Sequence, residues 1–433
     1  MPLVDRLRRL RILEPLAERD YRYLTIGSTI SLVGDGFFYV ALAWQVYELS
    51  NVPTALSLVG LAWTLPLVLF VVIGGVASDR YDRRRVMIVA DLGRAVTVGL
   101  IGTLSVLGVL ELWHVVGLIA FVGVGDAFFN PASTAIVPDL LAEERLPQAN
   151  ALNGALRPLT LRLIGPALAG FIVAAVGPGW AFVADGGSFL ASALAIGMIA
   201  SRRHLVERPV SGMRQTFSEI GEGFAFVRAN AWCWATLLAA MMSLLVFFGP
   251  VEVLLPFIVK NGLGMGPEAL GAIFAFGGIG SVVTAVAVGQ LGLPRRWITV
   301  MYAAWSIGVA LMAVYGLMTE LWHALVASLV IHGLFEIGQI TWTTMLQQLV
   351  PRGLLGRVSS LDWMVSTGLV PISFALTGPI ADAIGVRVTM VGAALLGGVL
   401  MGVLLFVPGV RDPEQRGLRQ LSPGGELLAA GDR

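Results

Sequence analysis

The chain of 433 residues has few charged residues and a single cysteine. Only 13 % of its residues are charged and 56 % are hydrophobic, whereas soluble domains are roughly 25 % charged. The one cysteine, Cys233, excludes an internal disulfide, a cysteine-based metal site and a haem attachment motif. Lysine is almost absent as well, because Lys260 is the one lysine among 29 basic residues. A mean hydropathy of +0.81 then indicates a protein of the lipid bilayer.

The sequence also lacks the motifs of several enzyme classes. It contains no metal-ligand cluster, no Gly-x-Ser-x-Gly turn and no phosphate-binding glycine loop. These absences count against a membrane enzyme that processes lipids, which is an alternative from another functional class. The missing phosphate loop also counts against ATP as an energy source. We therefore expect no enzyme activity, no cofactor, no metal site and no nucleic-acid partner.

The sequence does contain a series of long hydrophobic runs. A helix needs about 20 mostly apolar residues to cross the hydrocarbon core of a bilayer, and twelve such runs are present. Their approximate bounds are 23 to 47, 54 to 77, 86 to 109, 113 to 136, 150 to 176, 180 to 200, 234 to 258, 268 to 290, 297 to 318, 321 to 346, 358 to 382 and 386 to 407. The predicted fold class is an all-α membrane protein with 12 transmembrane helices in two pseudo-symmetric six-helix bundles.

Prolines recur in the two halves at an interval of 213 residues. The matched positions are Pro138 and Pro351, Pro158 and Pro371, and Gly165-Pro166 and Gly378-Pro379. Such a repeat indicates duplication of one bundle, and paired bundles with a site between them are typical of transporters. The predicted domains are an N-terminal bundle at 1–200, a linker at 201–232, a C-terminal bundle at 233–408 and a tail at 409–433.

The linker carries four apolar residues at helical spacing, Phe217, Ile220, Phe224 and Val227. This spacing predicts an amphipathic helix on the membrane surface.

The basic residues lie mostly on one side of the predicted membrane. The N-terminus, alternate connections and the C-terminal tail hold all of them except Arg94, Arg157, Arg162, Lys260 and Arg387. Because basic residues are concentrated in cytoplasmic loops, we expect both termini in the cytoplasm. The many arginines suggest a GC-rich bacterial source, so the expected location is the bacterial inner membrane.

Between the second and third runs, residues Gly75 to Arg85 read Gly-Val-Ala-Ser-Asp-Arg-Tyr-Asp-Arg-Arg-Arg. This loop resembles the signature of the major facilitator superfamily, which is a glycine, three residues, Asp-Arg, two residues and two basic residues. The segments Asn130 to Leu140, Ala149 to Leu152 and Gln347 to Asp362 resemble the branch of macrolide-type and other multidrug exporters and enterobactin-type exporters. The resemblance covers about residues 20 to 408 and implies a secondary transporter.

The resemblance also implies that the loop is a cytoplasmic gate. Its expected residues are Gly75, Asp79, Arg80, Arg83 and Asp139. A glycine at position 75 removes a side chain where two helices approach closely. Asp79 would face the positive end of the helix dipole near residues 356 to 359, and Arg83 would pair with Asp139.

The fifth run resembles in part the antiporter motif of the family, at Gly165, Pro166 and Gly170, but Leu161 and Ala169 stand where glycines are usual. A kinked helix with close packing of small residues explains the Gly-Pro pair equally well.

Four acids lie within the predicted spans, where ionisable groups are costly. Asp35, Asp126, Glu252 and Glu336 fall on runs one, four, seven and ten, which the resemblance makes the four cavity-lining helices. Burial favours the protonated form of a carboxyl group, so these acids could exchange protons and attract cations. We expect Asp35 and Asp126 to couple transport to protons first, then Glu336, whereas Glu252 could belong to an external gate. A structural, hydrogen-bonded acid is the alternative for each.

Arginines accompany these acids. Arg162 lies near the predicted midplane, and Asp126 or Asp35 is its expected partner. Asp91 and Arg94 are three residues apart and are expected to form a local ion pair.

Aromatic residues lie beside the acids and are expected to line the cavity. These are Phe38, Trp44, Phe129, Phe248 and Trp342. Apolar and aromatic walls with a few carboxylates suit bulky amphipathic cations.

The leading hypothesis is a proton-coupled antiporter that exports hydrophobic or amphipathic drugs or metabolites by alternating access, acting as a monomer in the lipid bilayer. Export of an anionic natural product such as a siderophore is the alternative, with Arg157 and Arg162 as attracting charges. A passive channel is a further option.

Overall fold

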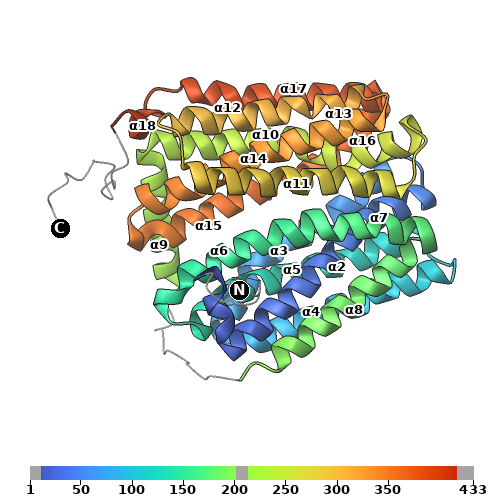
Figure 1. Ribbon diagram of the computed structural model, residues 1–433, viewed down its shortest axis with the longest axis horizontal. Helices are drawn as coiled ribbons and strands as arrows, with labels where there is room; N and C mark the ends of the chain where they lie inside the picture. Colours follow the sequence, from blue (N-terminus) through green and yellow to red (C-terminus); the bar gives the residue numbers. More distant parts are fainter. Residues whose placement is uncertain (1–10, 201–212, 417–433) are drawn as a thin grey trace, which may run out of the picture. The chain divides into compact units, whose positions relative to one another are not determined.

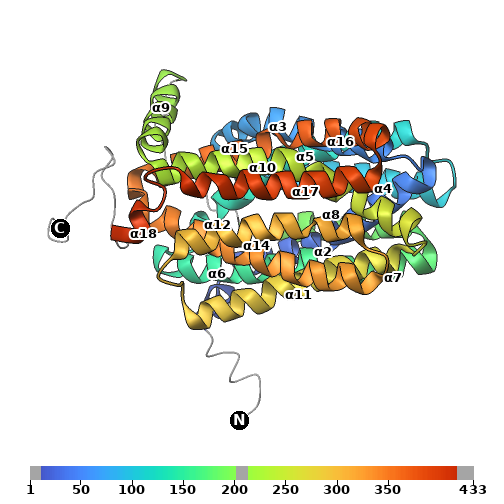
Figure 2. The same cartoon turned by 90° about the horizontal axis from the view of Figure 1, so that it is seen from above.

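The computed structural model describes residues 11–200 and 213–416, and all of their regular elements are helices. Twelve helices are long and apolar enough to cross a membrane, one for each predicted run. The chain divides into two compact units, which can be followed by colour in Figures 1 and 2. The predicted all-α fold with 12 membrane-spanning helices is confirmed.

Unit 1 contains the first half of the chain up to residue 204 and also residues 256–279. Its helices are η1 (Arg11–Ala17), α2 (Arg19–Leu49), α3 (Pro53–Arg80), α4 (Arg83–Val106), α5 (Leu112–Leu140), η2 (Glu143–Arg145), α6 (Leu146–Arg157), η3 (Pro158–Ile164), α7 (Gly165–Val176) and α8 (Pro178–Gly197), followed by η4 (Ile258–Gly262) and the start of α11 (Pro267–Leu291). The predicted segment 233–408 is therefore split, because residues 256–279 pack with unit 1.

Unit 2 contains residues 205–255 and 280–433, of which 213–255 and 280–416 are described. Its helices are α9 (Met213–Ala229), α10 (Ala231–Phe257), the second part of α11, α12 (Trp297–Leu311), α13 (Ala313–Leu317), α14 (Leu321–Leu349), α15 (Arg352–Gly368), α16 (Val370–Ile384), α17 (Val386–Val403), η5 (Leu404–Phe406) and α18 (Asp412–Arg416). Parts of the predicted linker and of the predicted tail lie outside the described residues.

Glycines allow the helices of unit 1 to approach closely. A Cβ atom on Gly74 of α3 would lie 2.0 Å from the carbonyl oxygen of Ala127 on α5, and one on Gly123 of α5 would lie 2.1 Å from the carbonyl oxygen of Trp63 on α3. Helices in membranes associate through such small residues because lipid tails supply no hydrophobic driving force between them. At Gly75, by contrast, a Cβ atom would meet no atom within 4 Å. Within unit 1 the close approach is therefore made by Gly74, one position earlier, while a close approach at Gly75 stays a prediction.

The two halves repeat in structure, but in a different register from the prolines. α5 and α14 each have 29 residues, each follows a glutamate, and each begins Leu-Trp-His with a capping box made by that glutamate and the histidine. Their last residues, Leu140 and Leu349, are 209 positions apart. The proline interval of 213 therefore differs from the interval between these helices by about one helical turn. Gly165-Pro166 begins α7, whereas Gly378-Pro379 lies inside α16.

The predicted linker helix is present as α9 and runs across the direction of α10 (Figures 1 and 2). Its Val227 is 7 % exposed and packs in the core of unit 2, whereas Phe224 is 59 % exposed. Glu222 on α9 forms an ion pair with Arg357 on α15. One part of the helix is therefore held against unit 2. The side chains of Phe217 and Ile220 lie outside the described part of the structure.

Candidate functional site

A buried ion-pair network lies inside unit 1. Arg94 on α4 is 3 % exposed and forms an ion pair with Asp91, one turn earlier on the same helix. Its Nη1 atom also donates to Oδ1 of Asp126 on α5 at 2.9 Å. Trp63 on α3 donates from Nε1 to the other oxygen of Asp126, also at 2.9 Å. The carboxylate of Asp126 thus joins α3, α4 and α5.

Aromatic rings surround the guanidinium group of Arg94. Its Cζ atom lies 4.3 Å from the ring centroid of Phe129 on α5 and 4.3 Å from that of Phe189 on α8. A cation over the face of an aromatic ring is attracted by the ring quadrupole, and the effect increases when water is absent. The rings therefore stabilise a charge that two carboxylates alone would hold less firmly.

This network confirms one sequence prediction and corrects another. The local ion pair of Asp91 and Arg94 is present, but Asp126 contacts Arg94 instead of the predicted Arg162. Arg162 lies on η3, where its side chain is exposed. The position of Arg94 along its helix was the sequence signal for the correct partner. α4 begins at Arg83, so at about 1.5 Å per residue Arg94 lies about 16 Å along the helix, well inside the span.

Asp35 on α2 lies between two glycines that bring other helices close. A Cβ atom on Gly34 would lie 2.4 Å from Oδ1 of Asp185 on α8, and one on Gly36 would lie 2.7 Å from Cα of Gly165. The half-buried carboxyl group of Asp35 interacts electrostatically with Arg94 and Asp126. Asp35 therefore belongs to the same charged group as the buried network.

The antiporter-like motif packs tightly on both sides. Gly165 and Pro166 contact Gly36, while Gly170 approaches the start of α11, where its Cβ atom would lie 3.0 Å from Cα of Glu268. The motif follows a π-helical segment, η3, and such segments are frequent at functional sites. Close packing of small residues, the alternative from the sequence, thus accounts for all three motif residues.

The predicted sites in unit 2 are less connected to one another. Glu252 on α10 and Glu336 on α14 are both half-buried. Trp342 is 4 % exposed, stacks edge-on against Trp232 and donates from Nε1 to Oδ1 of Asp362 at 3.2 Å. It therefore packs inside unit 2 and does not face an open cavity.

The other predicted cavity aromatics also have defined contacts. Phe38 is 4 % exposed and packs edge-on against Trp63 and Phe182, so it too is an interior residue. Phe129 contacts Arg94. Phe248 packs edge-on against Phe374 with the centroids 5.9 Å apart, and both belong to unit 2.

The expected gate loop contains the predicted ion pair. Nη1 of Arg83 lies 2.7 Å from Oδ2 of Asp139 and donates to the carbonyl oxygen of Ala135 at 2.6 Å. Asp79 is 3.9 Å from Arg83, and its side chain is 74 % exposed. Arg80 is exposed as well. The pairing of Arg83 with Asp139 is confirmed, while the partnership of Asp79 with residues 356 to 359 stays a prediction.

A second group of contacts joins the end of α2 to η4 within unit 1. Lys260 donates from Nζ to the carbonyl oxygen of Tyr47 and lies 5.5 Å from the ring centroid of Trp44. Next to it, the side-chain amides of Asn51 and Asn261 exchange two hydrogen bonds of 2.7 and 3.0 Å. We call these five residues the Lys260 clasp. The sequence does not reveal this group, because residues such as Asn51 and Asn261 are 210 positions apart in the chain.

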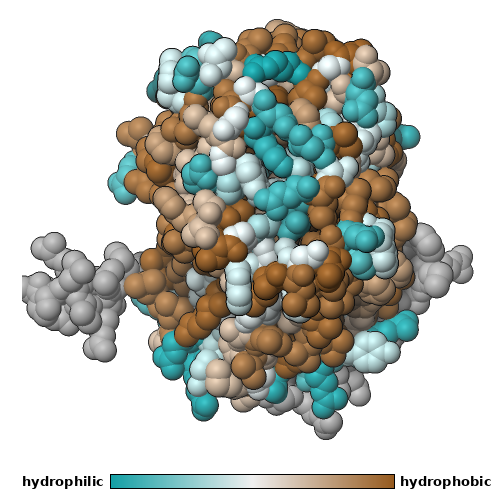
Figure 3. Space-filling view, turned by 90° about the vertical axis from the view of Figure 1, so that its right-hand side faces the viewer, coloured by the Kyte–Doolittle hydropathy of each residue, from teal (hydrophilic) through white to brown (hydrophobic). Residues whose placement is uncertain are grey.

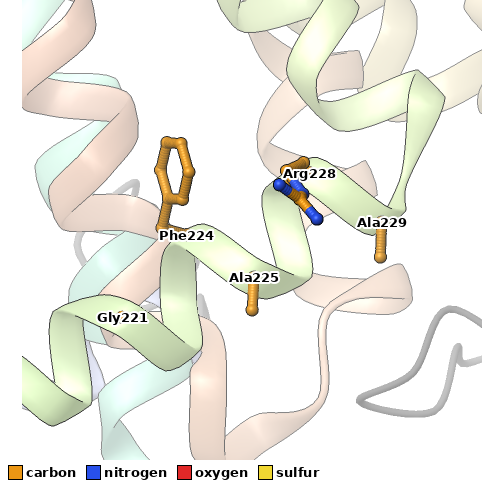
Figure 4. Close-up of a pocket in the computed structure, with 5 residues that line it drawn as sticks. All are labelled: Gly221, Phe224, Ala225, Arg228 and Ala229. Atoms are coloured by element: carbon orange, nitrogen blue, oxygen red, sulfur yellow. The ribbon is translucent and has the colours of Figure 1, made fainter.

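The surface features agree with a membrane protein. Figure 3 shows hydrophilic residues gathered among hydrophobic ones on the face that it draws. A separate pocket lies on α9, lined by Gly221, Phe224, Ala225, Arg228 and Ala229 (Figure 4). It contains none of the predicted transport residues.

Comparison with known proteins agrees with this architecture. Residues 11–423 match the family described as "Transmembrane secretion effector". The multidrug efflux pump Tap of Mycolicibacterium fortuitum is 29 % identical over 402 residues, which cover 88 % of this chain and 93 % of that protein. The enterobactin exporter EntS of Shigella boydii is 27 % identical over 424 residues, which cover 93 % and 94 %.

The fold is similar to that of solved transporters. The crystal structure of a D-xylose-proton symporter aligns with a TM-score of 0.68 at 15 % sequence identity, covering 90 % of this chain and 99 % of that one. The chain is thus a multi-pass inner-membrane transporter and not an enzyme, and it belongs to the transmembrane secretion effector family of the major facilitator superfamily.

Proposed function

We propose that this transporter is a proton-driven antiporter that exports amphipathic, mainly cationic drugs or metabolites. One observation carries the proposal: unit 1 places Asp35, Asp91, Asp126 and Asp185 near a single buried arginine, Arg94. Carboxyl groups in excess of their cations inside a membrane protein mark proton pathways in pumps and transporters. Two similar proteins are named for multidrug efflux and enterobactin export, and these names support outward transport.

Within this proposal the two first-ranked acids have different duties. Asp126 accepts hydrogen bonds from Arg94 and Trp63. Asp126 therefore holds α3, α4 and α5 together. Asp35 is half-buried and joins the network electrostatically, so Asp35 exchanges the proton and attracts the cationic cargo.

The second candidate function is export of an anionic natural product. Arg157 and Arg162 favour it, because both side chains are exposed and lie only five residues apart, on α6 and η3. An anion would bind there through charge-assisted hydrogen bonds. The two candidates differ in the charge that the cargo requires, so single substitutions separate them.

The experiment is flux into inverted membrane vesicles with an imposed pH gradient. The cargoes are the cationic dye ethidium, a macrolide and enterobactin, and the variants are Asp35→Asn, Arg162→Gln and, as a control, Asp382→Asn on the exposed end of α16. Gradient-dependent ethidium uptake that Asp35→Asn abolishes supports the first function. Enterobactin uptake that Arg162→Gln abolishes supports the second. If the uptake of every cargo is the same with and without the pH gradient, the result contradicts proton coupling.

We also propose that both termini face the cytoplasm. Cys233 is the only cysteine and is buried, so introduced cysteines report on topology without background. A membrane-impermeant maleimide added to intact cells should label Leu107→Cys, between α4 and α5, and not Tyr81→Cys, between α3 and α4; both side chains are well exposed. The reverse pattern would invert the topology.

A further inference from the structure

α8 presents a buried polar stripe to its neighbours in unit 1. Asp185, Ser188 and Ser192 lie on one face of the helix and are 0 %, 8 % and 0 % exposed. A Cβ atom on Gly27 of α2 would lie 3.3 Å from the backbone of Ser192, and α8 packs against both α2 and α4. The stripe thus runs between α2 and α4, at the depth of the Arg94 network.

Asp185 has an incomplete set of partners. Its Oδ1 atom accepts a hydrogen bond from Ser188 Oγ at 3.2 Å. Its Oδ2 atom is buried and has no hydrogen-bond partner among the described residues. A buried polar atom without a partner is rare in folded proteins and calls for a physical reason.

If every acid around Asp185 were ionised, the negative charges there would outnumber the positive ones. Asp185 interacts electrostatically with Asp35 on α2, Arg94 on α4 and Asp126 on α5. The guanidinium of Arg94 already binds Asp91 and Asp126, and Arg157 acts on Asp35. An ionised carboxylate at Asp185 would be a buried charge without an ion-pair partner among the described residues, which is strongly unfavourable.

The packing leaves room for a proton and not for a metal ion. A Cβ atom on Gly34 would lie 2.1 Å from Ser188 Oγ and 2.4 Å from Asp185 Oδ1. A hard cation needs at least six oxygen ligands at about 2.0–2.6 Å. Among the described residues, no group of three or more His, Cys, Asp or Glu side chains could hold a metal ion.

We propose that Asp185 and Asp35 form a proton-sharing pair, in which Asp185 is the buried proton-binding residue and Asp35 exchanges its proton with water or cargo. The inference rests on the proposed proton-driven transport and names the residues that carry the proton. The pair shares one proton, so the O–H bond on one carboxyl group breaks as the O–H bond on the other forms, and no other bond changes. While the proton lies on Asp185, a cation that approaches Asp35 meets an ionised carboxylate.

The first test is infrared spectroscopy of the purified, full-length protein, which needs no cargo. The carbonyl stretch of a protonated carboxyl group should be present in the wild type near neutral pH and absent in Asp185→Asn. In Asp35→Asn the band should disappear at a lower pH than in the wild type, because the negative charge of Asp35 that disfavours ionisation of Asp185 is gone. An unchanged titration contradicts the pair. Asp382→Asn is the control and should leave the band as it is.

The second test is ethidium transport in vesicles. Asp185→Asn imitates the neutral acid, so it should keep exchange of ethidium against ethidium and lose at least tenfold of the uptake driven by a pH gradient. Full gradient-driven uptake in Asp185→Asn, together with an unchanged infrared band, overturns the assignment. If the wild type shows the Asp185 band but no effect of the gradient, the proposed antiport is wrong while Asp185 remains a proton-binding residue.

Discussion

Arg94 of α4 donates to the carboxylate of Asp126 on α5 at 2.9 Å inside unit 1. The arginine side chain is 4 % exposed and that of Asp126 is 16 % exposed, so the pair is largely removed from water. Buried charges of this kind are stable only when each finds a partner and further hydrogen bonds. Asp91, Trp63 and the two phenylalanine rings supply those contacts here.

Removal of Arg94 is expected to be much more damaging than neutralisation of Asp126. Arg94→Gln leaves Asp91 and Asp126 without their cation and should lower stability by about 3–5 kcal/mol. Asp126→Asn leaves Arg94 paired with Asp91 and should cost about 1–3 kcal/mol. Thermal unfolding in detergent compares the two, with Arg80→Gln on the exposed gate loop as the control. Equal losses for both variants would contradict the network.

Gly74 and Gly75 form a matched pair for a test of helix packing. Gly74→Ala would place Cβ 2.0 Å from a carbonyl oxygen of α5, whereas Gly75→Ala places it where no atom lies within 4 Å. Overpacking costs typically about 1–3 kcal/mol. The yield of folded Gly74→Ala in membranes should fall and its melting temperature should drop, while Gly75→Ala should remain folded. A less stable Gly75→Ala would place the close approach at position 75 after all.

Arg83 and Asp139 are expected to act as a unit in transport. Their ion pair is partly exposed, with side chains 21 % and 41 % exposed, and such pairs contribute only about 0–1 kcal/mol to stability. Arg83→Asp and Asp139→Arg should therefore reduce transport more than they reduce the melting temperature. The double variant Arg83→Asp/Asp139→Arg should restore part of the flux. Arg85→Asp, on the same loop, is the charge-matched control, and a double variant no better than either single one argues against the pair.

The Lys260 clasp should determine how firmly the end of α2 is held. Lys260→Gln removes the cation over Trp44 and weakens the contact with the Tyr47 carbonyl. A cation–π contact contributes about 0.5–2 kcal/mol. Hydrogen exchange of residues 44–51 should become several-fold faster in the variant. Arg411→Gln, exposed in unit 2, should leave it unchanged, and equal protection in Lys260→Gln would show that the clasp contributes nothing.

The sequence was sufficient for the helices because their signals are local. A run of about 20 apolar residues must cross a bilayer wherever it occurs, so all twelve spans were predicted. The ion pair of Asp91 and Arg94 was predicted too, since residues three apart share one face of a helix. The partnership of Arg83 with Asp139 followed from resemblance to the family, and the structure confirms it.

Contacts between helices depended on which faces meet, and this is not a local property. A shift of one residue turns a helix by about 100°, and that shift separates Gly74, which touches α5, from Gly75, which does not. For the same reason the matched prolines gave a repeat interval of 213 residues, whereas α5 and α14 repeat at an interval of 209 residues.

The sequence by itself determined a duplicated, all-helical membrane transporter with acids in its spans, because hydropathy and motif spacing are read along the chain. Only the tertiary structure decided which partner each acid meets: Arg94 for Asp126, and for Oδ2 of Asp185 no hydrogen-bond partner in the part of the chain that the structure describes. The free energy of a buried charge depends on neighbours within a few ångströms, and folding alone brings those neighbours together.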